Sequence, residues 1–90
     1  MSSHGSMLGR TVLYKLDAFH ANKANEAHAP EGIRHLGNEH RQGDLVPMVI
    51  VREWGPGLVN GRVLLDGHGS LWVTSVHEGL ELGQWHEMGV

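Results

Sequence analysis

Two segments around a glycine-rich turn, at residues 59–76, constrain the fold of this chain most strongly. In the first segment, Val59, Val63 and Leu65 fall on one face of an extended chain, and the second segment reads SLWVTSV. Between them lies DGHG, and Asp-Gly is typical of a tight β-hairpin turn because glycine adopts positive φ without steric cost. The pattern predicts two antiparallel strands, with the valine-bearing face in the core.

Further β-type segments lie on both sides of this hairpin. The run LVPMVIVREW places Val46, Met48 and Ile50 on one face, and its other face is apolar too, which predicts a strand buried on both faces at its centre. Pro47 lacks a backbone donor, so we expect it at the entrance of the strand or at an edge position. A GPG turn follows this run, and a short last strand is expected at about residues 84–88.

A helical arm is predicted over about residues 11–29, with the helix itself at about 16–28. Leu16 and Phe19 fall on one helical stripe and are expected to anchor it. Asp17 should lie in the first turn, where a carboxylate interacts favourably with the positive end of the helix dipole. Because the apolar stripe is narrow, the helix needs to dock on the rest of the domain.

The length of 90 residues supports one hydrophobic core, so we predict a single domain over residues 7–90. Residues 1–6 form a short polar segment, which is expected to be an added segment or a disordered terminus. Pro30 should end the helix and open a connecting loop over about 30–44. The β-rich body should then span about 45–88.

Short strands separated by tight turns, together with one helix, predict a mainly β (α+β) fold. We expect a small antiparallel SH3-like barrel or a curled sheet of four to five strands with one N-terminal helix, because closing the sheet satisfies its edges. The main rival is a split α+β sheet with the helix on one face.

Composition excludes several classes of function. The chain has no cysteine, which removes disulfides, thiolate zinc sites and cysteine nucleophiles. A formal net charge of −3 provides no general basic field for a phosphate backbone, so nucleic acid is an unexpected partner. No run of about 18 apolar residues is present, so membrane insertion is not expected either.

A resemblance to a known group rests on the series GDLVPMVIVREW, LVNGRVLLDGHGSLWVTSV and GQWHEM, preceded by DAFHANKAN. This series resembles a group of small, mostly uncharacterised proteins encoded by tailed bacteriophages, especially those of actinobacteria. It spans about residues 11–88 and contains no catalytic signature. The resemblance implies a phage origin and action in the cytoplasm of the infected bacterial host, but no reaction. His68 and the HE pair at 86–87 depart from it.

Eight histidines raise the question of a metal site. The candidate ligands form two groups, His35, Glu39 and His40 in the loop, and His68, His77 and His86 at nine-residue intervals. No HExxH motif presents ligands from a helix, so solvent-exposed loop histidines are the favoured interpretation and no metal or other cofactor is predicted. No nucleophile elbow or phosphate-binding glycine loop is present, so we expect no enzymatic activity.

Five residues on the polar side of the hairpin are the predicted site for a ligand or partner. They are Asn60, Arg62, Asp66, Trp72 and Thr74. A tryptophan plate beside an arginine can stack on a planar ring and hold an anionic or carbonyl group through charge-assisted hydrogen bonds.

A structural role is the alternative for the same residues. Trp72 would then cover a second small core, and Arg62 would pair across the strands with Asp66 or Glu53. Trp54 and Trp85 are each expected to close an end of the core.

The leading functional hypothesis is a non-enzymatic phage accessory protein that acts by stoichiometric protein–protein binding, as a virion-associated protein or as an inhibitor of a host factor. The alternative is a small-molecule sponge that sequesters a nucleotide-like host signalling ligand between subunits, using Asn60, Arg62 and Trp72. We also expect a homo-oligomer, most simply a two-fold dimer, because a small core and an exposed edge strand favour self-association.

Overall fold

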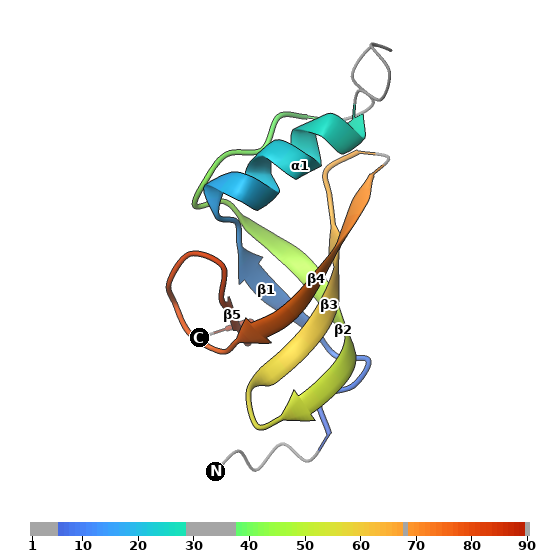
Figure 1. Cartoon of the computed structure of the whole chain (residues 1–90), viewed down its shortest axis with the longest axis vertical. Helices are drawn as coiled ribbons and strands as arrows, with labels where there is room; N and C mark the ends of the chain where they lie inside the picture. The colour runs from blue at the N-terminus through green and yellow to red at the C-terminus, as the bar shows by residue number, and fades with distance from the viewer. Residues whose placement is uncertain (1–5, 29–37, 68, 90) are drawn as a thin grey trace.

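The computed structural model describes residues 6–28, 38–67 and 69–89 of the chain. It contains one five-stranded antiparallel sheet and one helix (Figure 1). The elements are β1 (Thr11–Lys15), α1 (Ala18–His28), β2 (Leu45–Gly55), β3 (Leu58–Leu64), β4 (Ser70–His77) and β5 (Trp85–His86). The prediction of a mainly β fold with one helix is confirmed.

The sheet is strongly curled but is not closed into a barrel. Its strand order is β4-β3-β2-β1-β5, so β4 and β5 are the edge strands. These two edges approach each other at an isolated bridge between Glu78 and Trp85. Two backbone hydrogen bonds strengthen this corner, from Gly79 N–H to the Trp85 carbonyl and from Glu78 N–H to the Gly57 carbonyl.

Residues 11–15 form a strand, so the predicted helical arm over 11–29 is wrong at its start. Val12 and Tyr14 are buried, while Thr11 is exposed, which is the two-residue period of a strand with one covered face. β1 lies between β2 and β5 and pairs with both, although these partners are distant in the sequence. Thr11, Val12 and Tyr14 are residue types that favour strands, and this long-range pairing makes them part of the sheet.

The helix begins at Ala18, so Asp17, which was expected in the first turn, lies one residue before the helix. Asp17 is the N-cap: its Oδ1 accepts the His20 N–H at 2.8 Å, and its carbonyl accepts the Ala21 N–H at 2.9 Å. His20 Nδ1 also lies 2.9 Å from Asp17 Oδ1. Asp17 therefore satisfies donors at the helix N-terminus from a position outside the first turn.

Small residues, not the predicted aromatic anchor, attach α1 to the body of the protein. Ala21 and Ala24 are buried, whereas Phe19 is 62% exposed, so its assignment as an anchor is wrong. Leu16 is fully buried but lies before the helix. Figure 1 shows α1 lying across one end of the sheet.

The predicted end of the helix at Pro30 lies outside the described residues. Within the described ranges, no helix is long and apolar enough to cross a membrane.

β2 is buried on one face only, which corrects the prediction of burial on both. Val46, Met48 and Ile50 are buried, while Leu45 and Val51 are about half exposed. β2 is a central strand, between β3 and β1. The pairing of β2 with β3 starts at Met48, one residue after Pro47. Pro47, which has no backbone N–H, therefore lies just before the hydrogen bonds between these two strands begin.

The predicted hairpin is confirmed: β3 and β4 pair antiparallel, and the GPG turn separates β2 from β3. Val59 and Val63 are fully buried, as the sequence indicated. At Gly61 a Cβ atom would lie 2.3 Å from the Met48 side chain, so a larger residue there would force the Met48 side chain to move.

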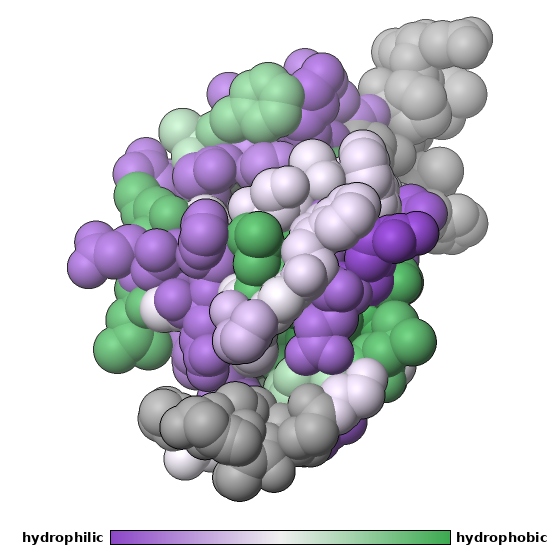
Figure 2. Space-filling view, turned by 60° about the horizontal axis from the view of Figure 1, so that its bottom comes forward, coloured by the Kyte–Doolittle hydropathy of each residue, from purple (hydrophilic) through white to green (hydrophobic). Residues whose placement is uncertain are grey.

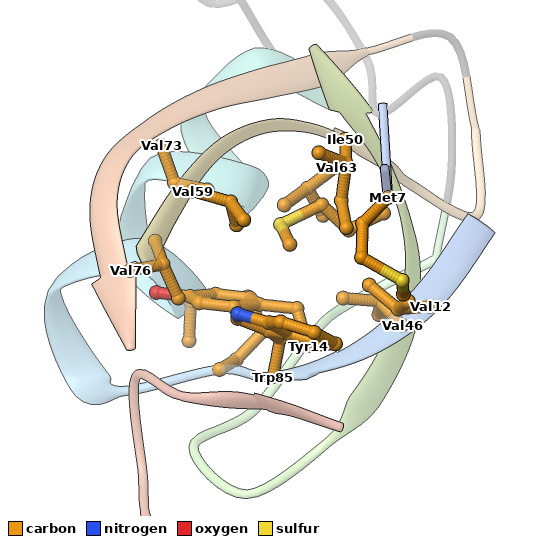
Figure 3. Close-up of a cluster of buried hydrophobic side chains, with 13 residues drawn as sticks. Met7, Val12, Tyr14, Val46, Ile50, Val59, Val63, Val73, Val76 and Trp85 are labelled. Carbon is orange, nitrogen blue, oxygen red and sulfur yellow. The ribbon is translucent and has the colours of Figure 1, made fainter. Parts of the chain in front are cut away.

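The core lies inside the curl of the sheet (Figure 3). The rings of Tyr14 and Trp85 lie side by side on one side of the core, opposite Ile50 and Val63. Trp85 is 1% exposed, and its Nε1–H donates to the Gly57 carbonyl at 3.1 Å. The prediction that Trp85 closes an end of the core is confirmed, and β5 is thereby tied to the turn between β2 and β3.

Tyr14 makes the stability of this core sensitive to alkaline pH. Its hydroxyl lies 3.1 Å from His20 Nδ1, and burial, with a further contribution from the Asp17 carboxylate, raises the pKa of Tyr14 from 10.0 to about 12. The unfolded phenol thus ionises at lower pH than the folded one. The stabilising contribution is complete below pH 10 and is lost as the pH rises through about 12.

We therefore expect the free energy of unfolding to fall by about 1.4 kcal/mol per pH unit across this window, as measured by urea denaturation at stepped pH. Phenolate absorbance reports the group directly, since the chain has a single tyrosine. Tyr14→Phe should remove this part of the pH dependence. A folded protein whose phenol ionises at its ordinary pKa would contradict the prediction.

Candidate functional site

The five residues predicted to form one site occupy three different environments. Arg62, Trp72 and Thr74 are exposed on the outer face of β3 and β4. Asn60 is buried beneath that face, with 6% of its surface exposed. Asp66 lies beyond the end of β3. Asn60 is therefore not accessible as Arg62, Trp72 and Thr74 are, and Asp66 lies outside both strands.

The partners of Asn60 explain its burial. The register between β3 and β4 shifts between Val59 and Gly61, and the register between β2 and β3 shifts between Ile50 and Arg52, so the extra residues lie in β4 and β2. β3 itself keeps its alternation, with Val59 and Val63 in the core and Arg62 exposed. Asn60 therefore lies on the same side of β3 as Arg62 and is covered by Trp54 and Thr74, which bond to its side chain.

The amide oxygen of Asn60 joins three strands. It accepts hydrogen bonds from Trp54 Nε1 at 3.0 Å, from Thr74 Oγ1 at 2.8 Å and from the Ser75 backbone N–H at 2.8 Å. Ser75 has a φ of 56°, which is unusual for a non-glycine residue, and this hydrogen bond helps to hold it there. The Asn60 oxygen thus acts within the fold and has no free position for a ligand.

Trp54 presents a fixed aromatic surface to solvent. Its side chain is 55% exposed, so the prediction that it closes an end of the core is wrong. The hydrogen bond to Asn60 orients the indole, and the Arg52 guanidinium carbon lies 4.8 Å from the ring centroid in a cation–π contact. No local sequence signal identifies this residue, because its exposure follows from the irregular end of β2.

A second exposed tryptophan lies on the same outer face. Trp72 is 55% exposed and stands opposite Arg62 in the pairing of β4 with β3. The structural alternative in which Trp72 covers a second core is therefore wrong. We call the exposed surface formed by Arg52, Trp54, Arg62, Trp72 and Thr74 the tryptophan face.

The acidic residues proposed to pair with Arg62 contact other groups. Glu53 Oε1 accepts the Met7 N–H at 3.2 Å and lies 3.4 Å from Ser6 Oγ. Asp66 Oδ2 accepts a hydrogen bond from Asn38 Nδ2 at 2.8 Å. The guanidinium of Arg62 is exposed beside Trp72, where it can meet an anionic group from outside the chain.

A cleft of about 490 Å³ lies at the opposite end of β2 and β3. Its polar lining includes the carboxylates of Glu39, Asp44 and Asp66, and we call it the acidic cleft. Its apolar walls include Leu45 and Leu64, which also belong to the outer face of the sheet. Unlike the tryptophan face, this end of the molecule presents negative charge beside apolar surface.

His40 anchors the loop that borders the acidic cleft. It is buried, its backbone N–H and carbonyl both bond to the Asn25 side chain, and its Nε2 accepts the Asp66 N–H at 3.3 Å. These contacts tie α1, the loop and the end of β3 together. His40 therefore has a structural role that loop position and composition did not indicate.

The other candidate metal ligands are separated or lie outside the described residues. His77 is exposed on β4 and His86 is buried on β5, with its Nδ1 lacking a hydrogen-bond partner. His35 and His68 fall outside the described residues. Within residues 6–28, 38–67 and 69–89, no three His, Cys, Asp or Glu side chains are grouped to hold a metal ion.

Chemically, the tryptophan face can stack on apolar or planar groups and pair with anions, while the hydroxyl of Thr74 is committed to Asn60. Hydrophobic residues otherwise reach the surface in separate patches among hydrophilic ones, as seen on the side of the molecule in Figure 2.

Comparison of the chain with protein-family models, with curated proteins and with solved structures returned no match to any of them.

Proposed function

We propose that this chain is a non-enzymatic phage accessory protein that binds a host or phage protein stoichiometrically through its tryptophan face. The observation that carries this proposal is the exposure of Trp54 and Trp72, at 55% each, with Arg52 over the Trp54 ring and Arg62 as the cross-strand neighbour of Trp72. Tryptophan and arginine are the residue types most enriched among energetically dominant contacts in protein interfaces. Action within a virion and inhibition of a host factor in the infected cytoplasm are both compatible with this chemistry.

Pre-organisation of the face supports binding. The Trp54 ring is already held by Asn60 and Arg52, so little side-chain freedom is lost when a partner covers it. The hydrogen-bonded network lies on paired strands and not on a free loop, which keeps the face in one geometry.

The partner surface should combine apolar and acidic groups. The chain as a whole carries a formal charge of −3, yet both charged side chains of the tryptophan face, Arg52 and Arg62, are basic. Beside Arg52 lies a second cleft of about 400 Å³, lined in part by Leu8 and Val51. An apolar side chain of the partner fits this cleft while an acidic neighbour pairs with the arginine.

The scaffold for this face is best described as an incomplete SH3-like barrel. In the order β4-β3-β2-β1-β5, the first strand of the chain, β1, lies beside the last, β5. The Glu78–Trp85 bridge brings the β4 and β5 edges of the sheet together. Such a small curled sheet leaves its outer face available for binding.

A nucleotide-like ligand is the second candidate, and the pairing of Trp72 with Arg62 is the observation in its favour. A base would stack on the indole while the guanidinium holds a phosphate. Asn60 cannot complete this site through its oxygen, which already accepts three hydrogen bonds. Co-purified ultraviolet-absorbing ligand, or a rise in melting temperature with added nucleotide, would favour this candidate over protein binding.

The test compares two aromatic truncations during infection. Trp72→Ala should release a partner that the wild-type chain retains, and calorimetry with that purified partner should give a fixed stoichiometry and an affinity reduced at least about 30-fold, as for a loss of 2 kcal/mol or more. Phe19→Ala is the matched control, because Phe19 is a similarly exposed aromatic residue but lies on α1. Equal retention by both variants, or substrate turnover by the purified chain, would contradict the proposal.

A further inference from the structure

The loop between β4 and β5 presents two leucines and a glutamate to solvent. Leu80 and Leu82 are 61% and 43% exposed, and Glu81 between them is exposed as well. Within the described part of the chain, the Glu81 carboxylate has no cationic partner. We call Leu80, Glu81 and Leu82 the leucine loop, and its surface has the pattern apolar, anionic, apolar.

Hydrogen bonds hold the leucine loop in one conformation. The side-chain oxygen of Gln84 accepts the Glu81 N–H at 3.0 Å, and the Gln84 N–H donates to the Glu81 carbonyl at 3.1 Å. The Gly83 N–H donates to the carbonyl of Lys15 on β1 at 2.7 Å, which ties the loop to the sheet. A surface held in this way loses little conformational freedom when it binds.

The tryptophan face carries the opposite charge in a matching pattern. In the pairing of the strands, Arg62 of β3 stands between Val49 of β2 and Trp72 of β4. Val49 is partly exposed and Trp72 is 55% exposed. No carboxylate among the described residues pairs with Arg62. This row across the sheet therefore has the pattern apolar, cationic, apolar.

We propose that the leucine loop of one copy of this chain binds the tryptophan face of another copy. Glu81 then pairs with Arg62, and the two leucines pack on the apolar side chains on either side of that arginine. The inference rests on the proposed function, since it names a second copy of the chain as a protein bound by the tryptophan face. Each copy has one loop and one face, so the copies join head to tail.

Charge complementarity selects this occupant. Both charged side chains of the tryptophan face are basic, and the leucine loop offers a carboxylate with apolar groups on both sides. A carboxylate–guanidinium pair is strong when neighbouring apolar contacts exclude water from it. Figure 1 shows the loop on the β5 side of the molecule, at the left of the view and apart from β2 and β3. The two surfaces of one copy are thus free to bind two other copies.

Light scattering on the purified chain over a range of concentrations tests the proposal. The mean mass should grow past that of a dimer. Arg62→Glu and Glu81→Arg should each raise the dissociation constant of the contact by at least about tenfold. The double variant Arg62→Glu/Glu81→Arg should restore association, because the two charges are only exchanged. Lys23→Glu and Glu26→Arg make the same changes of charge at exposed positions on α1 and should have no effect.

A mixture of two truncated variants tests the head-to-tail arrangement. Trp72→Ala weakens the face and Leu80→Ala/Leu82→Ala weakens the loop, so each variant alone should associate weakly. Their equimolar mixture should form one-to-one pairs that grow no further, because only one intact loop can meet one intact face. Phe19→Ala is the control for truncation of an exposed side chain and should associate like the wild type.

A wild-type chain that stays monomeric at its highest soluble concentration overturns the proposal. A mean mass that stops at a dimer overturns it too, since it shows a two-fold contact. The same conclusion follows if the double variant fails to associate, or if the charge controls weaken association as much as the reversals do.

The outcomes for this contact and for the proposed function are separable. Leu80→Ala/Leu82→Ala keeps the tryptophan face, so during infection it should retain any partner that Trp72→Ala releases. A wild-type chain that does not self-associate but has such a partner removes the inference and leaves the proposed function intact. Copies that assemble by these rules, without any other protein that depends on Trp72, do the reverse.

Discussion

Trp85→Ala is expected to remove about 3–5 kcal/mol from the free energy of unfolding, the largest effect of any single substitution considered for this chain. Trp85 is 1% exposed and is the largest fully buried side chain. Its removal opens a cavity beside Tyr14 and deletes the hydrogen bond to the Gly57 carbonyl. Because β5 is only two residues long, that indole is the main attachment of the strand to the core.

A loss of this size is a large fraction of the stability of a small domain, so the variant should be substantially unfolded at physiological temperature. Urea denaturation followed by circular dichroism measures the change. Trp72→Ala is the control with the same chemistry, and as an exposed residue it should change the free energy of unfolding by less than about 1 kcal/mol. Equal effects of the two substitutions would show that the indole of Trp85 does not carry the core.

Asn60→Ala is expected to destabilise the protein by about 2–4 kcal/mol, because three donors lose one acceptor at once. The three hydrogen bonds contribute unequally to this loss of stability. Thr74 can turn its hydroxyl to water, but the Ser75 N–H comes from a backbone at positive φ that this hydrogen bond helps to hold. The Trp54 indole loses its anchor as well.

Two measurements separate these effects. Thr74→Val removes a single hydrogen bond to the same oxygen and should cost only about 0.5–1.5 kcal/mol in urea denaturation. In a Trp72→Phe background, which keeps the buried Trp85, the fluorescence anisotropy of the exposed Trp54 should fall on Asn60→Ala, because the ring is no longer fixed. Unchanged stability together with unchanged anisotropy would refute the role of Asn60 as the centre of this network.

The Asn60 network also links stability to the proposed binding face. The same oxygen holds a buried junction of β3 and β4 and orients an exposed indole. Substitutions at Asn60 should therefore weaken partner binding even though the side chain is buried. Such coupling means that a loss of binding at this position must be compared with the loss at Trp72, which leaves the fold intact.

Local pattern in the sequence was sufficient for the hairpin, the GPG turn and the buried valines, because side-chain alternation and the φ preferences of glycine act over a few residues. The same expectation of closing an end of the core was made for Trp54 and Trp85, and only Trp85 is buried. For the candidate site, side-chain alternation placed Arg62 and Trp72 on the face opposite the valines, and the structure shows that both are exposed there. Their function stays a prediction.

Tertiary structure decided the rest. Thr11, Val12 and Tyr14 are strand-favouring residue types, but the place of residues 11–15 in the sheet depends on β2 and β5, which lie on either side of them and are not close in sequence. The irregular pairing of β2 and β4 with β3 left Trp54 exposed and brought Trp54, Thr74 and Ser75 to the Asn60 amide, which they bury. A bulge is fixed by the register between strands, and that register depends on long-range hydrogen bonds and packing, which a local period of two does not encode.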